Sequence, residues 1–143
     1  MALTKGIQRT YGIGVGEFLL KTPVRAGSTI YEGSAVSSSS TGFVRPATAA
    51  AGESFRGFAE ENKDNASGSD GDLEVLVRKE GTVTLPITLT GESDVGADVY
   101  ASDDGTFTLS AGTNNVKIGK LIRFISVTHG SVSFEAAERR SVA

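Results

Sequence analysis

The sequence contains no cysteine and no tryptophan, and it has a single histidine, His129. Without cysteine there can be no disulfide, no thiolate metal site and no cysteine nucleophile. One histidine is too few for the usual imidazole metal centres, so we expect no metal and no other cofactor. No run of about eighteen apolar residues is present, which excludes a membrane-spanning helix of ordinary length, and we expect no membrane partner.

Net charge and chain length narrow the class of protein further. The 143 residues carry a formal net charge of -3, and 22% of them are charged while 38% are hydrophobic. This length suits one domain with its own core, and the composition is that of a folded chain. Nucleic-acid-binding proteins usually carry a basic surplus, so we expect no nucleic acid partner. The first ten residues lack the apolar stretch of a signal peptide, so we expect synthesis in the cytoplasm.

The residues that are abundant favour short β-strands. The chain has 18 glycines, with many serines, threonines and valines beside them. Turn signals recur about every 8–12 residues, a spacing typical of all-β sandwiches and barrels. The clearest strand covers residues 82–89, in which apolar residues alternate with Thr84, Pro86 and Thr88, and Pro86 indicates an edge or a bulge. We therefore predict an all-β fold: a small antiparallel β-sandwich, a jelly roll or a small barrel.

The N-terminal segment has a different character. Glycine alternates with other residues from Tyr11 to Gly16, which disfavours a helix and weakens a strand. We predict an extended N-terminal arm over residues 1–22, a β domain over 23–136 and a C-terminal tail over 137–143. An extended arm can add a strand to a neighbouring sheet through main-chain hydrogen bonds. The candidate binding residues of the arm are Tyr11, Gly12, Ile13, Gly14, Val15 and Phe18, and those of the tail are Arg139 and Arg140.

Side chains that could carry catalysis are sparse. His129 falls in a predicted turn, and the paired acids Asp103 and Asp104 belong to a predicted hairpin turn, where we expect them to be solvated. Residues 61–72 form a predicted exposed loop whose acids suggest calcium, although their spacing does not match an EF-hand. No acid–base pair, nucleophile or metal set stands out, so we expect a protein that is not an enzyme.

Several segments, taken in order, resemble phage head decoration proteins, which are also called capsid cement proteins. In the first half the similar stretches are Ile30–Val36, Gly42–Ala47 and Phe55–Ala59, and in the second half they are Gly96–Leu109 and Ile118–Lys120. Together they fall within residues 27–135. Each stretch is a common β-turn-β pattern, and it is their order that carries the resemblance. The glycine-rich segment before residue 23 departs from it.

The resemblance implies structural work on the outside of an expanded icosahedral head. Such a protein clamps neighbouring subunits of the major capsid protein, has no catalytic residues and forms a homotrimer, with a homodimer as the second choice. The small barrel would then be β-tulip-like, and the protein would be located on the capsid exterior of the virion. The alternative is a carbohydrate-binding or adhesion module, although such modules usually present exposed aromatic residues, tryptophan above all. A small β-barrel enzyme is a third, weaker possibility.

Overall fold

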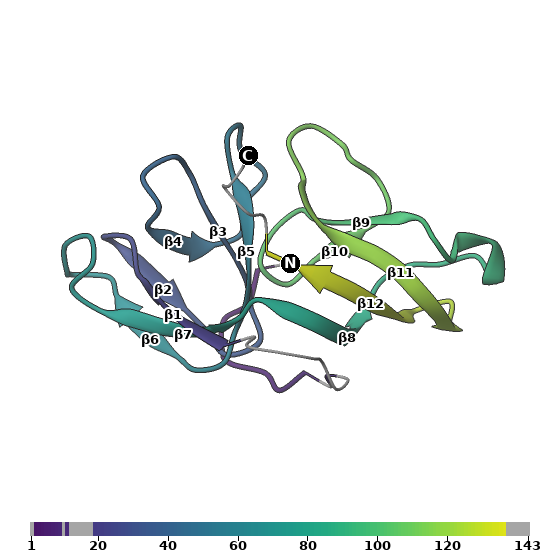
Figure 1. Ribbon diagram of the computed structural model, residues 1–143, viewed down its shortest axis with the longest axis horizontal. Helices are drawn as coiled ribbons and strands as arrows, with labels where there is room; N and C mark the ends of the chain where they lie inside the picture. The colour runs from purple at the N-terminus through teal and green to yellow at the C-terminus, as the bar shows by residue number, and fades with distance from the viewer. Residues whose placement is uncertain (1, 10, 12–18, 137–143) are drawn as a thin grey trace.

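The computed structural model describes residues 2–9, 11 and 19–136, and this part of the chain is built from β-strands (Figure 1). Its single helical element is one short 3-10 turn, η1 (Glu92–Asp94). The strands are β1 (Leu19–Pro23), β2 (Ser28–Ile30), β3 (Ala35–Ser38), β4 (Val44–Pro46), β5 (Ser54–Ala59), β6 (Lys63–Asn65), β7 (Glu74–Arg78), β8 (Glu80–Pro86), β9 (Asp98–Ala101), β10 (Phe107–Thr108), β11 (Val116–Ser126) and β12 (His129–Glu135). The predicted all-β class is confirmed.

Two five-stranded antiparallel sheets make up the body. The first sheet has the strand order β1-β7-β5-β3-β4 and the second has β10-β9-β11-β12-β8, while β2 and β6 form a separate pair. Figure 1 shows the first sheet on the left and the second on the right. Strand β5 of the first sheet packs against β11 and β12 of the second, so that the two sheets share a core, as in a small β-sandwich.

The chain passes from one sheet to the other almost without interruption. Strand β7 ends at Arg78 and β8 begins at Glu80, so only Lys79 separates a strand of the first sheet from a strand of the second. The Ala136 amide, just beyond β12, donates a hydrogen bond of 2.6 Å to the Lys79 carbonyl. Lys79 therefore forms a corner between the two sheets, and its carbonyl is hydrogen-bonded to the residue that follows β12.

The core reflects the alternation that the sequence predicted in residues 82–89. Val83, Leu85, Ile87 and Leu89 are all buried, and they pack with residues of β9, β11 and β12. Strand β8 is the last strand of the second sheet, which confirms the edge position predicted from Pro86. A smaller apolar cluster joins the first sheet to β2 and to the residue after β1, and it consists of Val24, Ile30, Val36, Val44, Ala59, Val75 and Val77.

The predicted boundary between arm and body at residue 23 is wrong. Strand β1 begins at Leu19 and pairs along its length with β7, so residues 19–22 belong to the first sheet. Thr22 within this strand is buried. Pro23, which separated arm from body in the sequence, is instead the last residue of β1, and an edge strand can accommodate proline.

Residues 61–72 are also not the uniformly exposed loop that was predicted. Lys63–Asn65 form β6, and the buried Asn65 donates from Nδ2 to the carbonyls of Val24, Arg25 and Ser69. An amide that is hydrogen-bonded in this way can be buried at little cost. The acids nearby bind protein donors: Asp64 accepts from Thr29, Asp70 from the Ala26 amide and Asp72 from the Ser69 amide.

Candidate functional site

The N-terminal segment lies against the body. The Leu3 amide donates to Asp104 Oδ1 over 3.0 Å, and the Ile7 amide donates to the Glu32 carbonyl over 2.7 Å. Arg9 Nε donates to the Gly33 carbonyl, also over 2.7 Å. These bonds join residues 2–9 to turns that precede β3 and β10. The described part of the predicted arm is therefore bound to its own chain.

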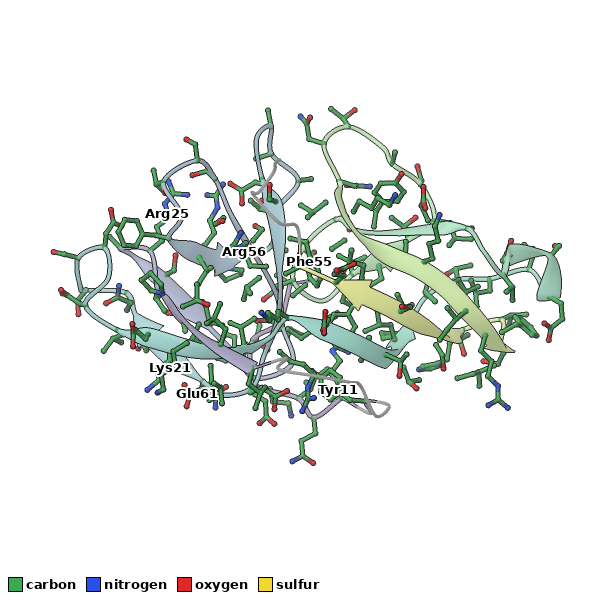
Figure 2. All side chains as sticks on the ribbon, in the orientation of Figure 1. Tyr11, Lys21, Arg25, Phe55, Arg56 and Glu61 are labelled. Atoms are coloured by element: carbon green, nitrogen blue, oxygen red, sulfur yellow. The ribbon has the colours of Figure 1, made fainter. Side chains whose placement is uncertain are left out.

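Two side chains of this segment close the junction between the sheets. The Arg9 guanidinium lies 5.3 Å from the Phe107 ring centroid and 5.9 Å from that of Phe58. The Tyr11 ring meets Phe58 at 6.4 Å and Phe134 at 6.1 Å between centroids. Burial lowers the pKa of Arg9 and raises that of the Tyr11 phenol well above its ordinary value. Figure 2 shows Tyr11 and Phe55 at the region where the two sheets meet.

Tyr11 is held from its outer side as well. The Arg78 guanidinium lies 4.4 Å from its ring centroid, and Arg78 Nε bonds to Glu60 Oε2 over 2.7 Å. The backbone of Tyr11 forms an isolated antiparallel bridge with Val83 at the edge of β8. The side chain predicted to contact a capsid therefore packs on this chain's own core, and its role in binding stays a prediction.

The other predicted contact residues cannot be placed. Gly12, Ile13, Gly14, Val15 and Phe18 lie outside the described residues, and so do Arg139 and Arg140 of the predicted tail. The sequence missed Arg9, whose guanidinium lies near the Phe58 and Phe107 rings. No local signal could have identified it, because its partners Phe58 and Phe107 are distant in the sequence.

Asp104 corrects the expectation of solvated turn acids. Its residue is only 2% exposed, its carboxylate accepts the Leu3 amide, and its carbonyl accepts the Ala35 amide of β3. Burial raises the pKa of the Asp104 carboxyl. The neighbouring Asp103 accepts from the Gly105 amide and has a lowered pKa, since this bond and others outweigh the effect of its partial burial.

Replacing Asp104 by asparagine is expected to stabilise the protein at neutral pH. A carboxyl whose pKa is higher in the folded state favours folding when protonated, and this contribution is lost as the pH rises above its unfolded value of about 4. Asparagine keeps the oxygen that accepts the Leu3 amide and carries no charge. Melting temperatures of both proteins between acid and neutral pH test this: the advantage of Asp104→Asn must grow with pH, and an advantage that shrinks would contradict it.

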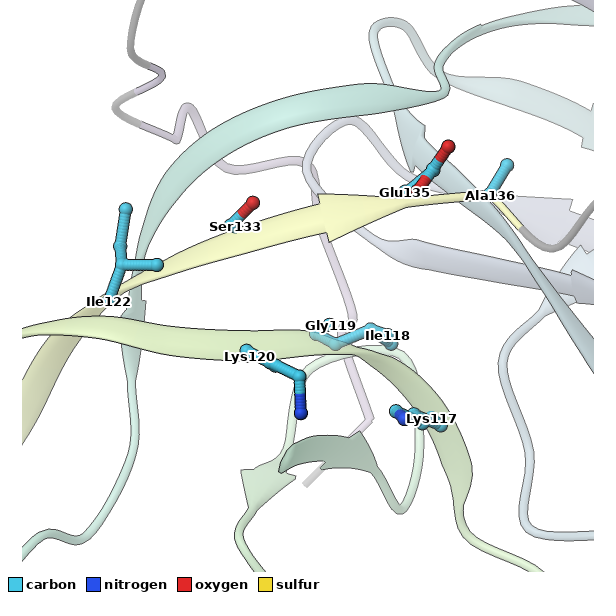
Figure 3. Close-up of a pocket in the computed structure, with 8 residues that line it drawn as sticks. All are labelled: Lys117, Ile118, Gly119, Lys120, Ile122, Ser133, Glu135 and Ala136. Atoms are coloured by element: carbon cyan, nitrogen blue, oxygen red, sulfur yellow. The ribbon is translucent and has the colours of Figure 1, made fainter. Parts of the chain in front are cut away.

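A groove runs along the outer face of the second sheet, with a volume of about 640 Å³ (Figure 3). Its lining comes from β11, β12 and the residue after β12: Lys117, Ile118, Gly119, Lys120, Ile122, Ser133, Glu135 and Ala136. Lys120 Nζ lies 2.7 Å and Lys117 Nζ 3.4 Å from the same oxygen, Oδ1 of Asp98. The hydrogen bond from Lys120 is the main cause of the lowered pKa of Asp98. This groove is called the outer groove below.

The described side chains form no cluster of the kind that binds a metal ion. Within residues 2–9, 11 and 19–136, no three His, Asp or Glu residues gather as a metal site would require. His129 is exposed, as predicted, and its Nδ1 lies 3.0 Å from Thr128 Oγ1. In the same part of the chain, no helix has the length and apolar character needed to span a bilayer.

Comparison with known proteins gives no further direction. No family model matches the sequence, and no curated protein is significantly similar to it.

Proposed function

We propose that this protein is a structural cement that binds the outside of an expanded icosahedral phage head and clamps neighbouring subunits of the major capsid protein. The observation that supports it is the ordered series of β-turn-β segments that resembles decoration proteins. In the fold, the first-half segments contribute to β2, β3, β4 and β5, and the second-half segments contribute to β9, β10 and β11. The first half thus supplies strands to the first sheet and to the β2–β6 pair, and the second half supplies strands to the second sheet.

A cement needs adhesive surface more than it needs a cleft. Edge strands offer unpaired main-chain groups to another chain. Three of the four sheet edges carry an isolated bridge to another segment: β4 at Val44, β8 at Val83 and β10 at Phe107. Among the described residues, β1 itself has no such bridge, although Val24 directly after it makes the bridge to Val44, and residues 19–22 of β1 belong to the predicted arm. Strand addition at β1 would extend the first sheet onto a capsid subunit.

Lattice geometry supplies the affinity that one small domain lacks. A standard protein interface buries about 1,600 Å² in total. A homotrimer or homodimer that contacts several identical subunits at once can bind tightly through smaller individual contacts, because the later contacts form at high effective concentration. Binding alone would then hold neighbouring capsid subunits together against internal pressure. No chemical step would be needed.

Co-sedimentation with phage heads tests this function. We expect saturable binding to emptied, expanded heads and none to unexpanded precursor heads, with a copy number that indicates the symmetry site. Absence of binding to either would refute the cement function and favour the carbohydrate-binding alternative, which a glycan array can examine.

A further inference from the structure

The N-terminal segment, residues 2–9 with Tyr11, contacts both sheets. Leu3 and Tyr11 bond to the turn before β10 and to β8 of the second sheet, whereas Ile7 and Arg9 bond to the turn before β3 of the first sheet. The body residues that receive it, here called the segment site, are Glu32, Gly33, Phe58, Asp104, Phe107 and Phe134. None of them lines the outer groove.

The segment and its site fit closely. Gly33 has a φ of 86°, and a Cβ atom there would meet the Ile7 carbonyl oxygen. A Cβ atom at Gly6 would lie 3.1 Å from Glu32 Cβ. The hydrogen bonds that Leu3 and Ile7 make to the body come from main-chain amides. Contacts of this kind require no covalent link between the segment and the body that receives it, so the same segment of another copy would fit equally well.

Two polar atoms remain without a partner when the segment is bound. Arg9 Nη2 and Ser34 Oγ are buried and make no hydrogen bond within the part of the chain that the structure describes. Ser34 directly follows Gly33, whose carbonyl accepts from Arg9 Nε. A buried polar group without a partner costs the free energy of its lost hydration, and a charged group costs more. Water can hydrate Arg9 once the segment leaves, so opening is less costly than the segment's contacts alone would require.

The chain between the segment and β1 limits which partner the segment can reach. Eight residue steps separate Tyr11 from Leu19, and a chain of that length extends at most about 29 Å. Leu19 itself is fixed by the pairing of β1 with β7. A segment that leaves its own body can therefore dock only on a molecule close to that body. A second copy of this chain carries the matching site, since its segment site is identical.

We propose that neighbouring copies exchange the N-terminal segment, so that the segment of one copy docks at the segment site of the next. The closed and the exchanged forms make the same contacts between segment and body. Their ratio therefore depends on the protein concentration relative to the effective concentration of the segment at its own site. Exchange rises with concentration and is favoured wherever copies lie side by side. It requires no capsid, so it does not rest on the proposed cement function.

Two single-cysteine variants detect exchange directly, because the chain has no cysteine of its own. Gly6→Cys in one copy and Glu32→Cys in another bring the two Cβ atoms to 3.1 Å only when the segment of the first lies on the second. A shift of a few tenths of an ångström gives the roughly 3.5–4.5 Å of a disulfide. Under oxidising conditions a covalent heterodimer should accumulate on a non-reducing denaturing gel. With Ser40→Cys, in the exposed turn after β3, replacing Glu32→Cys, the yield should fall to that of random collision.

Tyr11→Ala in only one of the two partners provides a matched control. The substitution removes the ring contacts with Phe58 and Phe134. In the Glu32→Cys partner it loosens that copy's own segment and frees its site, so the heterodimer should form about tenfold faster, the equivalent of one or two aromatic ring pairs. In the Gly6→Cys partner the same loss favours release and disfavours docking, so the rate should hardly change.

Equal yields with Glu32→Cys and Ser40→Cys at every protein concentration would overturn the proposal. Equal acceleration by Tyr11→Ala in either partner would also overturn it, because unfolding of the whole chain would then explain the heterodimer. The cysteine comparison decides by itself if Tyr11→Ala does not fold. Since the assay contains no capsid, failure of the cement function leaves its result unchanged.

Discussion

Gly119→Val is expected to lower the free energy of unfolding by about 3 kcal/mol, since overpacking against rigid backbone costs at least as much as overpacking a core. A Cβ atom at Gly119 would lie well within contact distance of the Ser133 carbonyl oxygen and close to Phe134 Cα on the paired strand β12. Both neighbours are backbone atoms of a hydrogen-bonded ladder, so neither can move aside cheaply. The melting temperature should fall by roughly 10 °C.

Gly91→Val is the matched control for this prediction. Gly91 has an extended φ of 161°, and nothing lies within 4 Å of a Cβ built on it. The same substitution there should change the melting temperature by only a degree or two. Calorimetry of the two variants decides the matter: similar losses at both positions would mean that valine itself, and not the close approach of β12, is responsible.

Phe58→Ala is expected to cost about 4 kcal/mol, the usual loss when a buried phenylalanine is truncated. Phe58 is fully buried, and its ring centroid lies 4.9 Å from Phe134, 5.5 Å from Phe55 and 6.0 Å from Phe107. It also contacts Tyr11 and Arg9 of the N-terminal segment. The variant should therefore loosen this segment in addition to destabilising the body.

Phe55→Ala separates the two effects. Phe55 is as buried as Phe58 and packs on Phe58 and Phe134, whereas its ring pairs do not include Tyr11. Both variants should unfold at lower temperature, but only Phe58→Ala should accelerate hydrogen exchange at the Ile7 amide, which bonds to Glu32. Equal exchange in the two variants would show that the segment is held by its hydrogen bonds alone.

Local pattern predicted the parts of the fold that depend on local geometry. The alternation in residues 82–89 gave the buried face of β8, and a glycine within a strand, such as Gly119, often marks a bulge. The structure places a register shift between Lys117 and Gly119 in the pairing with β9. Both features follow from the period of a strand and from the absence of a side chain, which can be seen in a short window of sequence.

Features that depend on distant partners could not be predicted in this way. Asp104 is buried because its carboxylate meets the amide of Leu3, 101 residues away, and Asn65 because its amide meets Val24, 41 residues away. Ile122 and Ile125, each about half exposed, lie at the two register shifts between β11 and β12, and no periodicity in the sequence marked either residue as surplus. In each case the environment is made by tertiary contacts that only the folded chain brings together.

The corner at Lys79 gives the molecule an unusual mechanical property. Because β7 and β8 are consecutive along the backbone, a pulling force applied to the first sheet reaches the second through covalent bonds rather than through side-chain packing. The load is then shared along the whole register of β8 with β12, from the Pro86–His129 pair to the Glu80–Glu135 pair. Hydrogen bonds loaded in parallel along two strands must break together. We therefore expect the sandwich to resist extension in the direction of β7 and β8.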